Sequence, residues 1–409
     1  MRDTVTDFYD KLETRSADER AAAIARALPE QIARAKALPG HATRLADVNP
    51  AGVVDARALA ALPVLRKSEL GSAQAADGPL GGFAGPVSGF AHIFQSPGPI
   101  YEPGGVSHDW WRMGRFLHAA GIGSGDIVQN CFGYHLTPAG MIFESGARAV
   151  GATVLPAGTG QTELQARAAH DIGVTAYAGT PDYLKVILDK ADQMGLSLTI
   201  TKAAVGGGAL FPSLRQEYAD RGIACLQSYA TADLGNIAYE SAAMEGMIVD
   251  EGVIVEIVRP GTGDPVAPGE VGEVVVTTLN PDYPLIRFAT GDLSAVMAGQ
   301  SPCGRTNIRI KGWMGRADQT TKIKGMFVRP EQVADLVARH EDVGRARIVA
   351  DREGEMDVML VQLETSGTEA SVYEQSVLDT LKLRGRIELV PAGSLPNDGK
   401  VIEDRRSYE

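Results

Sequence analysis

Short apolar strands that alternate with helical segments through the middle of the chain constrain its fold more than any other feature. Each of these apolar runs is bounded by glycine and is followed by residues with helical periodicity. Because neighbouring parallel strands are usually joined through a helix, this alternation predicts βαβ units and a mainly parallel sheet. In open α/β folds of this kind, ligands bind at the strand ends. The predicted strands are Ile127–Phe132, Ala152–Leu155, Ala176–Ala178 and Lys202–Val205.

The segments on either side of this region have different patterns. Ala, Leu and Ile recur at helical spacing over Ala17–Ala37, which predicts an amphipathic helix that is broken or restarted at Pro29. From Gly246 onward, strands separated by Pro/Gly turns predict an antiparallel sheet or a partly closed barrel, with strands at Val253–Val258 and Gly272–Thr278. A compact α+β pattern follows. Its predicted elements are strand 321–327, helix 331–340, strands 346–350 and 358–363, and helix 369–383.

The length of 409 residues exceeds what one hydrophobic core usually fills. The chain is therefore predicted to be an α/β protein with a large N-terminal domain of βαβ sheets, residues 1–317, in which residues 246–314 form a small β-barrel-like portion. Residues 318–409 are predicted to follow as a small, mobile α+β lid domain. At roughly 90 residues, this last part is large enough to be a domain of its own.

Charge and composition exclude several classes of partner. The formal net charge is −12 with no long basic run, so neither nucleic acid nor an anionic membrane surface is expected as the main partner. No stretch reaches the ~18 apolar residues of a membrane span, and the first residues lack an apolar signal region. Three widely spaced cysteines form no disulfide framework, which favours a reducing compartment. A cytoplasmic protein is expected; its oligomeric state stays open, with a homodimer the commonest closed assembly.

The segment Tyr283–Asp292 places an aspartate after a Thr-Gly turn at the end of an apolar strand. The carboxylate of Asp292 can accept two hydrogen bonds there from a vicinal diol, such as the 2′,3′-hydroxyls of a ribose. For this segment alone, a turn aspartate that satisfies its own backbone is the simpler interpretation.

A basic segment, Gly315–Asp318 followed by Lys322–Gly325, lies at the predicted domain junction. The guanidinium of Arg316 offers a planar fork for ribose or phosphate oxygens, and Gly325 permits close approach of the backbone to a ligand. Asp318 can absorb a change in backbone angles as a hinge. A solvated charge run on an exposed hairpin is an equal alternative.

A third polar segment, Gln227–Gly235, follows an apolar strand. The ring of Tyr229 can stack on a purine, and the carboxylate of Asp233 can hold a Mg²⁺ ion that bridges phosphates. A buried tyrosine and a capping aspartate explain the same residues equally well. After another strand, Gly206–Ala209 permits backbone contact with a flat ring, against the alternative of a simple loop.

A lysine in a glycine turn near the end of the sequence completes an ordered set of segments. Lys400 lies in Pro396–Glu409, after the segments around Asp292 and Asp318. In this order the segments resemble the adenylate-forming acyl-CoA synthetases, and within them the phenylacetate-CoA ligase-like branch. The resemblance covers nearly the whole chain, and its most branch-specific part is Pro302–Thr306. It also includes Leu62–Leu70, Gly151–Thr162 and Gly179–Leu184.

The resemblance implies a two-step reaction. A carboxylate, here of an aromatic phenylacetate- or benzoate-like acid, attacks the α-phosphate of ATP and releases pyrophosphate; the thiol of coenzyme A then attacks the acyl-adenylate and releases AMP. The small-molecule acid, ATP, Mg²⁺ and coenzyme A are the implied partners and cofactors. Lys400 would bridge the acyl carboxylate and the α-phosphate in the adenylating pose only. A cation brought in by a closing domain stabilises the charge that builds on the pentavalent phosphorus.

The resemblance also implies roles for other residues. Asp292 would hold the ribose hydroxyls, and Arg316 would contact the nucleotide near the hinge at Asp318. Tyr229 would stack on adenine, and Asp233 stands where the family usually has a magnesium-binding Glu. Further nucleotide-binding residues would be Gly207, Gly208, Ala209, Ser228 and Ala230. The acyl pocket would contain Tyr134, His135, Tyr177 and Gly235, although a structural role is the simpler interpretation of His135. The loop on the coenzyme A side would contain Lys322, Lys324 and Gly325.

The phosphate-gripping loop of the family is altered in this chain. Its candidate is Ser96–Pro103, where Ser96 and Gly98 match, two prolines cannot donate backbone hydrogen bonds, and Glu102 reverses the expected charge. Either Ser96, Gly98 and Tyr101 form a rigid substitute, or the protein is a nucleotide- or acyl-adenylate-binding homologue with impaired adenylation. A carrier-protein thiol or an amine as the acceptor also stays open.

Some relatives carry a Cys/His cluster near the Cys-Gly-Arg segment. This chain retains Cys303, but Ser301 and the segment Ser241–Gly246 stand where other ligands would be expected. One thiol cannot make a tetrahedral site, so no structural zinc is predicted.

Overall fold

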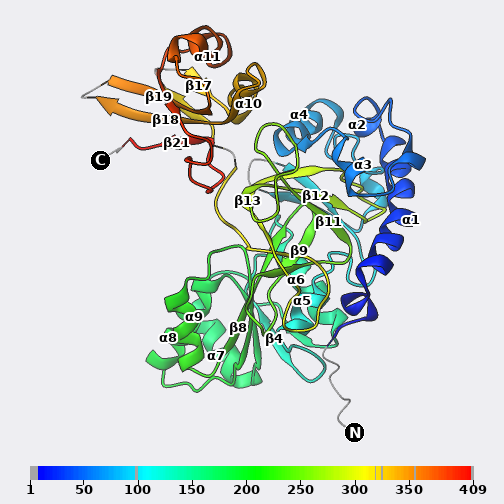
Figure 1. Cartoon of the computed structure of the whole chain (residues 1–409). Coiled ribbons are helices and arrows are strands. Elements are labelled where there is room, and N and C mark those ends of the chain that lie inside the picture. The colour runs from blue at the N-terminus through cyan, green and yellow to red at the C-terminus, as the bar shows by residue number, and fades with distance from the viewer. Residues whose placement is uncertain (1–7, 97–99, 318, 324–325, 354–355, 407–409) are drawn as a thin grey trace. The chain divides into compact units, whose positions relative to one another are not determined.

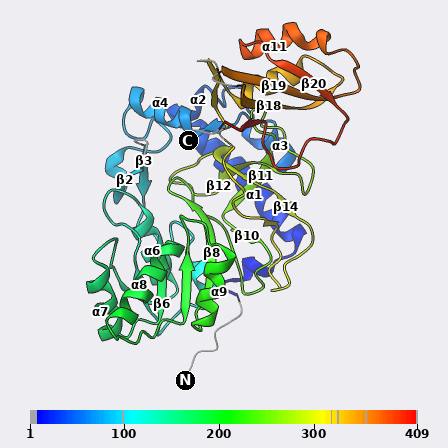
Figure 2. The same cartoon turned by 90° about the vertical axis from the view of Figure 1, so that its left-hand side faces the viewer.

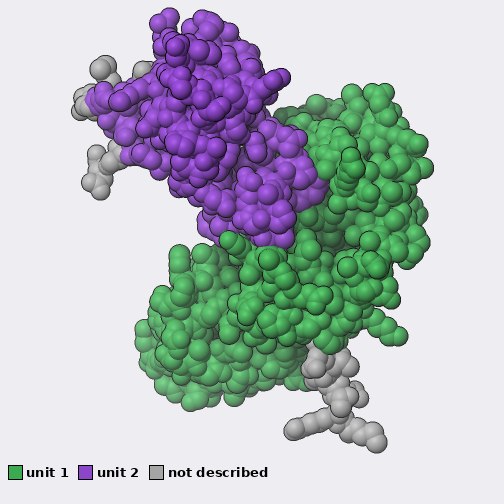
Figure 3. All heavy atoms as spheres, viewed as in Figure 1, with its two compact units in different colours: residues 1–255, 276–288, 297–312 green, residues 256–275, 289–296, 313–409 purple. Residues whose placement is uncertain are grey.

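The computed structural model describes residues 8–96, 100–317, 319–323, 326–353 and 356–406. The chain divides into two compact units, coloured separately in Figure 3. Unit 1 comprises residues 1–255, 276–288 and 297–312, and unit 2 comprises residues 256–275, 289–296 and 313–409. The domain boundaries expected from the sequence, 1–317 and 318–409, stay predictions.

A nine-stranded sheet in the order β14-β15-β10-β9-β8-β7-β6-β4-β5 is the largest sheet of the structure (Figures 1 and 2). Its pairs are parallel from β5 to β8 and antiparallel from β8 through β9 and β10 to β15. The predicted strand Lys202–Val205 is β7, and the other three predicted strands match to within two residues. The strands are β4 Ile127–Asn130, β5 Thr153–Leu155, β6 Ala176–Gly179, β8 Ala224–Thr231, β9 Gly235–Tyr239, β10 Met247–Val249, β14 Val296–Met297 and β15 Arg309–Ile310.

Helices cover both faces of the parallel part of this sheet (Figure 1). Helices α7 Thr162–Ile172, α8 Pro181–Gln193 and α9 Pro212–Asp220 lie on one face, and α6 Ala139–Ala149 lies on the other. In α8 the buried residues recur at helical spacing, and two of them, Leu184 and Leu188, join a core cluster with residues of β6 and β7. A helix with a single apolar face packs that face against the sheet. Helices of this kind on both sides therefore cover both faces of the sheet. The buried residues of α8 are Pro181, Leu184, Ile187, Leu188 and Ala191.

The N-terminal helix α1, Ala17–Lys36, runs without interruption through Pro29, so the predicted break at that residue is wrong. Ser16 and Glu19 form a capping box at its start. Its buried face packs into a core cluster that includes Leu28 and Ile32. Burial of this face and the cap offset the hydrogen bond that a proline removes from a helix interior.

Several short elements precede or follow α1 in unit 1, including a hairpin of β2 and β3. They are η1 Lys11–Thr14, α2 Pro39–Ala42, η2 Pro50–Gly52, α3 Ala56–Ala60, α4 Lys67–Asp77, η3 Val87–Gly89, β2 His92–Ser96, β3 Ile100–Gly104 and α5 Gly114–Ala119.

Among the described residues, no helix has both the length and the apolar character that a membrane span requires.

A four-stranded sheet has the order β1-β13-β12-β11. Strands β11 Val253–Val258 and β12 Gly272–Thr278 match their predicted bounds, and β1 Leu65–Arg66 and β13 Phe288–Ser294 complete the sheet. Arg287, 2% exposed, donates to the carbonyls of Ala60 and Leu62, and its backbone N–H donates to Thr277 Oγ1 at 2.9 Å. A buried guanidinium therefore ties the start of β13 to the N-terminal segment.

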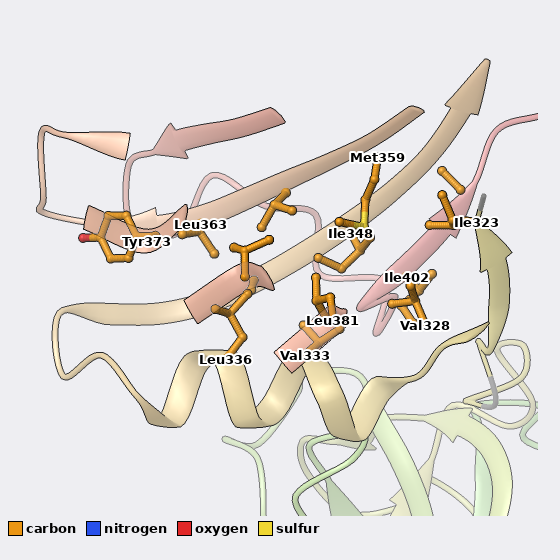
Figure 4. Close-up of a cluster of buried hydrophobic side chains, with 14 of the residues drawn as sticks. Ile323, Val328, Val333, Leu336, Ile348, Met359, Leu363, Tyr373, Leu381 and Ile402 are labelled. Carbon is orange, nitrogen blue, oxygen red and sulfur yellow. The ribbon is translucent and has the colours of Figure 1, made fainter. Parts of the chain in front are cut away.

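The C-terminal part of unit 2 is an α+β fold around a four-stranded sheet, β20-β19-β18-β21. Figure 4 shows its core, in which Val333 and Leu336 of α10 meet Ile348 of β18. The predicted strand 321–327 is instead a hairpin of two short strands, because the chain reverses between them. The predicted helix 369–383 is shorter and begins as a 3-10 turn. The elements are β16 Thr321–Ile323, β17 Met326–Val328, α10 Pro330–Ala338, β18 Val343–Glu353, β19 Met356–Thr365, η4 Ala370–Tyr373, α11 Glu374–Leu381, β20 Arg386–Val390 and β21 Ile402–Asp404.

Candidate active site

Asp292 lies in β13 of unit 2 and receives two side-chain hydrogen bonds at one carboxylate oxygen. Trp313 Nε1 donates to Oδ1 at 3.1 Å, and a terminal nitrogen of Arg316 donates to the same oxygen at 3.0 Å. The carboxylate is 12% exposed, whereas the side chain of Arg316 is 57% exposed. The site therefore presents a fixed carboxylate beside a guanidinium that is accessible to a ligand.

The backbone explains how Asp292 and Arg316 come together. Ala317 N donates to the carbonyl of Gly291 at 2.8 Å, and Leu293 N donates to that of Gly315 at 2.9 Å. Gly291 has a φ of 74°, and a Cβ there would stand 2.8 Å from the Arg316 guanidinium, so the Thr-Gly-Asp turn requires glycine. The sequence singled out Asp292 and Arg316 separately, and only the fold joins them. Trp313 was not predicted.

The glycine loop after β7 lies against β8 in unit 1. A Cβ on Gly206 would stand 3.2 Å from Ser228 Oγ, which is buried with no hydrogen-bond partner among the described residues. Tyr229 is 8% exposed on β8, and the register between β8 and β9 shifts between Tyr229 and Ala230. Bulges of this kind often lie beside active sites, because they redirect side chains. The next loop residues, Gly207, Gly208 and Ala209, are exposed.

Asp233 is buried and forms an ion pair with a residue that the sequence gave no reason to select. Its side chain is 1% exposed, and Oδ2 accepts from Lys67 Nζ at 2.8 Å. Lys67 is the first residue of α4, and 166 positions separate the pair, so no local pattern reveals it. The other oxygen, Oδ1, has no hydrogen-bond partner among the described residues. A buried carboxylate oxygen without a donor fits a hard cation such as Mg²⁺.

Glu102, from the altered phosphate loop, lies close to this ion pair and is 0% exposed. Burial, together with the negative charge of Asp233, raises the pKa of Glu102 to about 8, while Ser96 and Lys67 oppose the shift. Neither oxygen of Glu102 makes a hydrogen bond of normal geometry with a described residue. Burial, Asp233 and Glu102 also raise the pKa of Tyr283, which is 1% exposed. A second buried carboxyl group, that of Glu102, therefore lies near Asp233.

The remaining part of the altered loop is a β-hairpin. Ser96 of β2 pairs with Ile100 of β3 and is buried, and Gly98 lies outside the described residues. The backbone N and O of Tyr101 are both held by the amide of Gln74 at 2.8 Å. Tyr101 as a whole is 36% exposed. A phosphate contact by Ser96 or Tyr101 stays a prediction.

The four residues expected in the acyl pocket occupy different environments in unit 1. Tyr134 is half-buried, with its hydroxyl accepting from Asn130 Nδ2 at 2.7 Å, and His135 is exposed. Tyr177 is 0% exposed in the core and donates to the carbonyl of Thr180 at 2.9 Å. Gly235 is buried at a φ of 71°, and a Cβ there would stand 2.6 Å from the Trp111 carbonyl. Packing thus accounts for Tyr177 and Gly235 in this structure.

Two phenylalanines that the sequence did not single out lie beside the glycine loop. The rings of Phe132 and Phe143 are 4.2 Å apart between centroids. A Cβ on Gly207 would stand 3.7 Å from Phe132, and one on Gly206 would stand 3.6 Å from Phe143. An aromatic wall therefore borders the loop predicted to contact a flat ring.

Lys400 is exposed in unit 2, and its backbone N donates to Asp398 Oδ1 at 3.0 Å. The predicted hinge residue Asp318 and the loop residues Lys324 and Gly325 lie outside the described residues. For Lys322 the structure describes the backbone, which belongs to β16. The roles proposed for these residues therefore stay predictions.

The segment around Cys303 is held by local polar contacts. Ser301 Oγ lies 3.1 Å from Cys303 Sγ, and Arg305 pairs with Glu13 at 2.8 Å. Within the described ranges, no group of three His, Cys, Asp or Glu side chains could hold a metal ion. The absence of a structural zinc stays a prediction.

Comparison with solved structures identifies the fold. The chain is similar to an open conformation of 2-hydroxyisobutyryl-CoA ligase in complex with 2-HIB-AMP and CoA, with a TM-score of 0.73 and 23% sequence identity. The match covers 97% of this chain and 93% of that one. The thioesterification state of the same ligase gives a TM-score of 0.71 over 99% of this chain. The fold is that of the adenylate-forming acyl-CoA ligases.

Sequence comparison narrows this class to a family. The chain is 30% identical over 338 residues to the phenylacetate-coenzyme A ligase of Thermus thermophilus, covering 78% of this chain and 75% of that protein. It is 29% identical over 357 residues to the Escherichia coli phenylacetate-coenzyme A ligase, covering 79% and 80%. No family model matches. The chain belongs to the phenylacetate-coenzyme A ligase family and is by class an AMP-forming acid–CoA ligase, which confirms the resemblance of its motifs.

Proposed function

We propose that this protein activates an aromatic carboxylic acid with ATP and transfers the acyl group to coenzyme A. The observation that carries the proposal is the group at Asp292, a nearly buried carboxylate with fixed donors and an exposed guanidinium from Arg316 beside it. An ionised carboxylate can accept hydrogen bonds from ribose hydroxyls, and a guanidinium can contact phosphate oxygens. This pair supports a nucleotide as the ligand.

The first step forms the acyl-adenylate. A carboxylate oxygen of the acid attacks the α-phosphorus of ATP, and the bond to pyrophosphate breaks. Negative charge develops on the phosphoryl oxygens in the transition state, so a cation placed there lowers the barrier. Lys400 is the proposed cation, because its side chain is exposed on a turn whose backbone is held. Asp233 would hold Mg²⁺, which would neutralise phosphate charge.

The second step forms the thioester. The sulfur of coenzyme A attacks the acyl carbonyl, its thiol proton passes to solvent water, and the bond to AMP breaks. Lys400 would no longer be required, because AMP leaves with its negative charge already in place. The segment Lys322–Gly325 is the proposed contact for the incoming pantetheine.

An aromatic acid is supported by the wall that Phe132 and Phe143 form beside Gly206 and Gly207. Aromatic side chains prefer offset or edge-to-face contacts with a flat ring, and glycine permits close approach. The names of the sequence relatives point to the same class of acid. The acyl pocket proposed from the sequence is thereby extended by these two phenylalanines.

Pyrophosphate release with a panel of acids tests the proposal. Purified protein with ATP and Mg²⁺ should release pyrophosphate with phenylacetate or a benzoate and should release less with short aliphatic acids of equal charge. Mass spectrometry should then show the matching acyl-CoA once coenzyme A is added. A folded protein that releases no pyrophosphate with any acid contradicts the proposal.

A second candidate function is a nucleotide- or acyl-adenylate-binding protein with impaired adenylation. The observation that favours it is Glu102, because a buried carboxyl group near Asp233 repels phosphate oxygens when it is ionised. Calorimetry distinguishes the candidates. Tight AMP binding with negligible binding of magnesium-ATP favours this second function, whereas magnesium-ATP binding that weakens in Asp233→Asn favours the ligase.

A further inference from the structure

The side chain of Gln319 holds the turn that carries Lys400. Its Nε2 donates to the carbonyl of Gly399 at 2.9 Å. Its Oε1 accepts from the backbone N of Val401 at 2.6 Å and from that of Ile402 at 2.8 Å. One amide group therefore bonds the backbone on both sides of Lys400, and all of these residues belong to unit 2.

A second set of contacts, from Asp398 and from β18, holds the same turn. The backbone N of Lys400 donates to Asp398 Oδ1 at 3.0 Å, and Asp398 pairs with Arg347, which is 3% exposed. Ile348 N donates to the carbonyl of Val401 at 2.9 Å, where β21 begins to pair with β18. The backbone around Lys400 is thus held firmly, while its side chain remains exposed.

The chemistry of these bonds requires a primary amide. A single group has to donate to a carbonyl oxygen and accept from two N–H groups, which a glutamine amide does with one NH₂ and one C=O. Glutamate at this position would keep the acceptor but would place negative charge against the carbonyl oxygen of Gly399. Leucine would leave three polar backbone groups without their partner.

We propose that Gln319 is a positioning residue for Lys400 in the adenylation step. The proposal rests on the function proposed above. Gln319 directly follows Asp318, the predicted hinge residue. Its side chain therefore connects the segment next to the predicted hinge with the turn that carries Lys400. The bonds from Gln319 set the direction in which Lys400 leaves the backbone, and a catalytic group misplaced by about 1 Å can cost 100-fold in rate.

Separate measurement of the two half-reactions tests this role. In Gln319→Leu, acid-dependent pyrophosphate release should fall by about 10- to 100-fold in kcat, with little change in KM for ATP. Thioester formation from a supplied acyl-adenylate and coenzyme A should stay within about twofold of wild type, because that step does not use Lys400. The rate of pyrophosphate release in Gln319→Glu should lie between those of wild type and Gln319→Leu.

Gln332 provides a matched control in the same unit. Its Nε2 donates to the carbonyl of Thr380 at 2.9 Å, and its Oε1 accepts from Arg329 N at 3.0 Å, but it does not touch the Lys400 turn. Gln332→Leu should leave both half-reactions at the wild-type rate. A loss of adenylation in this control equal to that in Gln319→Leu would contradict a specific role for Gln319.

A double-mutant cycle tests whether Gln319 acts through Lys400. If it does, Gln319→Leu should reduce adenylation no further in a protein that already carries Lys400→Ala. Additive losses would contradict the proposal. So would a wild-type rate of adenylation in Gln319→Leu, or an equal fall in both half-reactions.

Hydrogen exchange separates this inference from the proposed function. The amides of Val401 and Ile402 should exchange at least about tenfold faster in Gln319→Leu than in wild type, because their acceptor is removed. If wild-type protein shows no acid-dependent pyrophosphate release but these amides lose protection in the variant, the proposed function fails while the contact stands. Unchanged exchange contradicts the contact whatever the activity.

Discussion

At the scale of single residues, buried carboxylates distinguish this protein. Asp292, Asp233 and Glu102 are each at most 9% exposed, but each has a different set of partners. Asp292 accepts from Trp313 and Arg316, Asp233 pairs with Lys67, and Glu102 has no normal hydrogen bond with a described residue. Since burial of a charge costs free energy unless it is paired, the partners of Asp292 and Asp233 offset the cost of burying these two side chains.

Asp292→Asn should weaken nucleotide binding. The amide keeps the shape of the carboxylate but removes the charge that strengthens its hydrogen bonds, so the Kd for AMP measured by calorimetry should rise about 10- to 100-fold, in keeping with about 1.5–3 kcal/mol for a charged hydrogen bond. Asp282 is the matched control, because it accepts from Trp110 Nε1 at 3.0 Å in a comparable contact. A similar loss in Asp282→Asn would contradict a ribose contact at Asp292.

Glu102→Gln should change the pH dependence of stability. The pKa of Glu102 is about 8 in the folded protein, above its ordinary value of 4.5, so the folded state binds more protons than the unfolded state between these pH values. The contribution of Glu102 to the free energy of unfolding therefore falls in wild type as pH rises from 4.5 to 8. The amide cannot titrate, so the Glu102→Gln variant should not show this fall. Above pH 8 the variant should gain up to about 5 kcal/mol in free energy of unfolding.

Denaturant titration between pH 4 and pH 9 checks the Glu102 prediction. The two proteins should differ least near pH 4, where the glutamate is protonated in both states, and most at the alkaline end. Parallel stability curves for wild type and Glu102→Gln would show that Glu102 does not titrate in this range.

At the scale of elements, the packing around α2 sets the pKa of its histidine, His41. His41 is 0% exposed, and its ring meets Phe83 edge-on with 4.8 Å between centroids. Burial, together with the nearby charge of Arg44, lowers the pKa of His41 to about 4. The short helix α2 therefore places a neutral imidazole in the core of the N-terminal segment.

His41→Leu should reduce the acid sensitivity of the fold. In wild type the unfolded state takes up a proton near pH 6.5, but the folded state does so only near pH 4, so stability is lost as pH falls through this window. The loss should reach about 3 kcal/mol at the acid end, and leucine should remove it. His108→Leu is the control, because that histidine is exposed. Equal acid slopes for wild type and His41→Leu in urea titrations would contradict the prediction.

At the scale of the whole molecule, the candidate residues are divided between two compact units. Asp233, Tyr229 and the glycine loop belong to unit 1, and Asp292, Arg316 and Lys400 belong to unit 2. In the proposed reaction Lys400 acts in the first step only. Removal of Lys400 should therefore affect the two half-reactions differently.

Lys400→Ala should lower pyrophosphate release by at least about 100-fold, because the cation acts on charge that develops in the transition state. Thioester formation from a supplied acyl-adenylate should stay within about twofold of wild type. Lys382→Ala, in the same unit, should change neither rate. Equal losses in both half-reactions of Lys400→Ala would contradict a role confined to adenylation.

Much of the fold could be predicted because it depends on local patterns. Strands β7, β11 and β12 have the predicted bounds, since alternating or continuous apolar residues between turn residues are read directly from the chain. Strands β20 and β21 were missed because they are short, five and three residues long. The continuity of α1 through Pro29 was also missed, because the burial of one face outweighs a local helix breaker.

The sequence by itself determined the order of motifs, and with it the family and the identity of Asp292, Asp233 and Lys400 as candidates. The tertiary structure alone decided their partners. Lys67 reaches Asp233 across 166 positions, and Gln319 reaches the Lys400 turn across 80 or more. Such pairs form because buried polar groups need partners, and folding selects those partners by proximity in space, which no local pattern records.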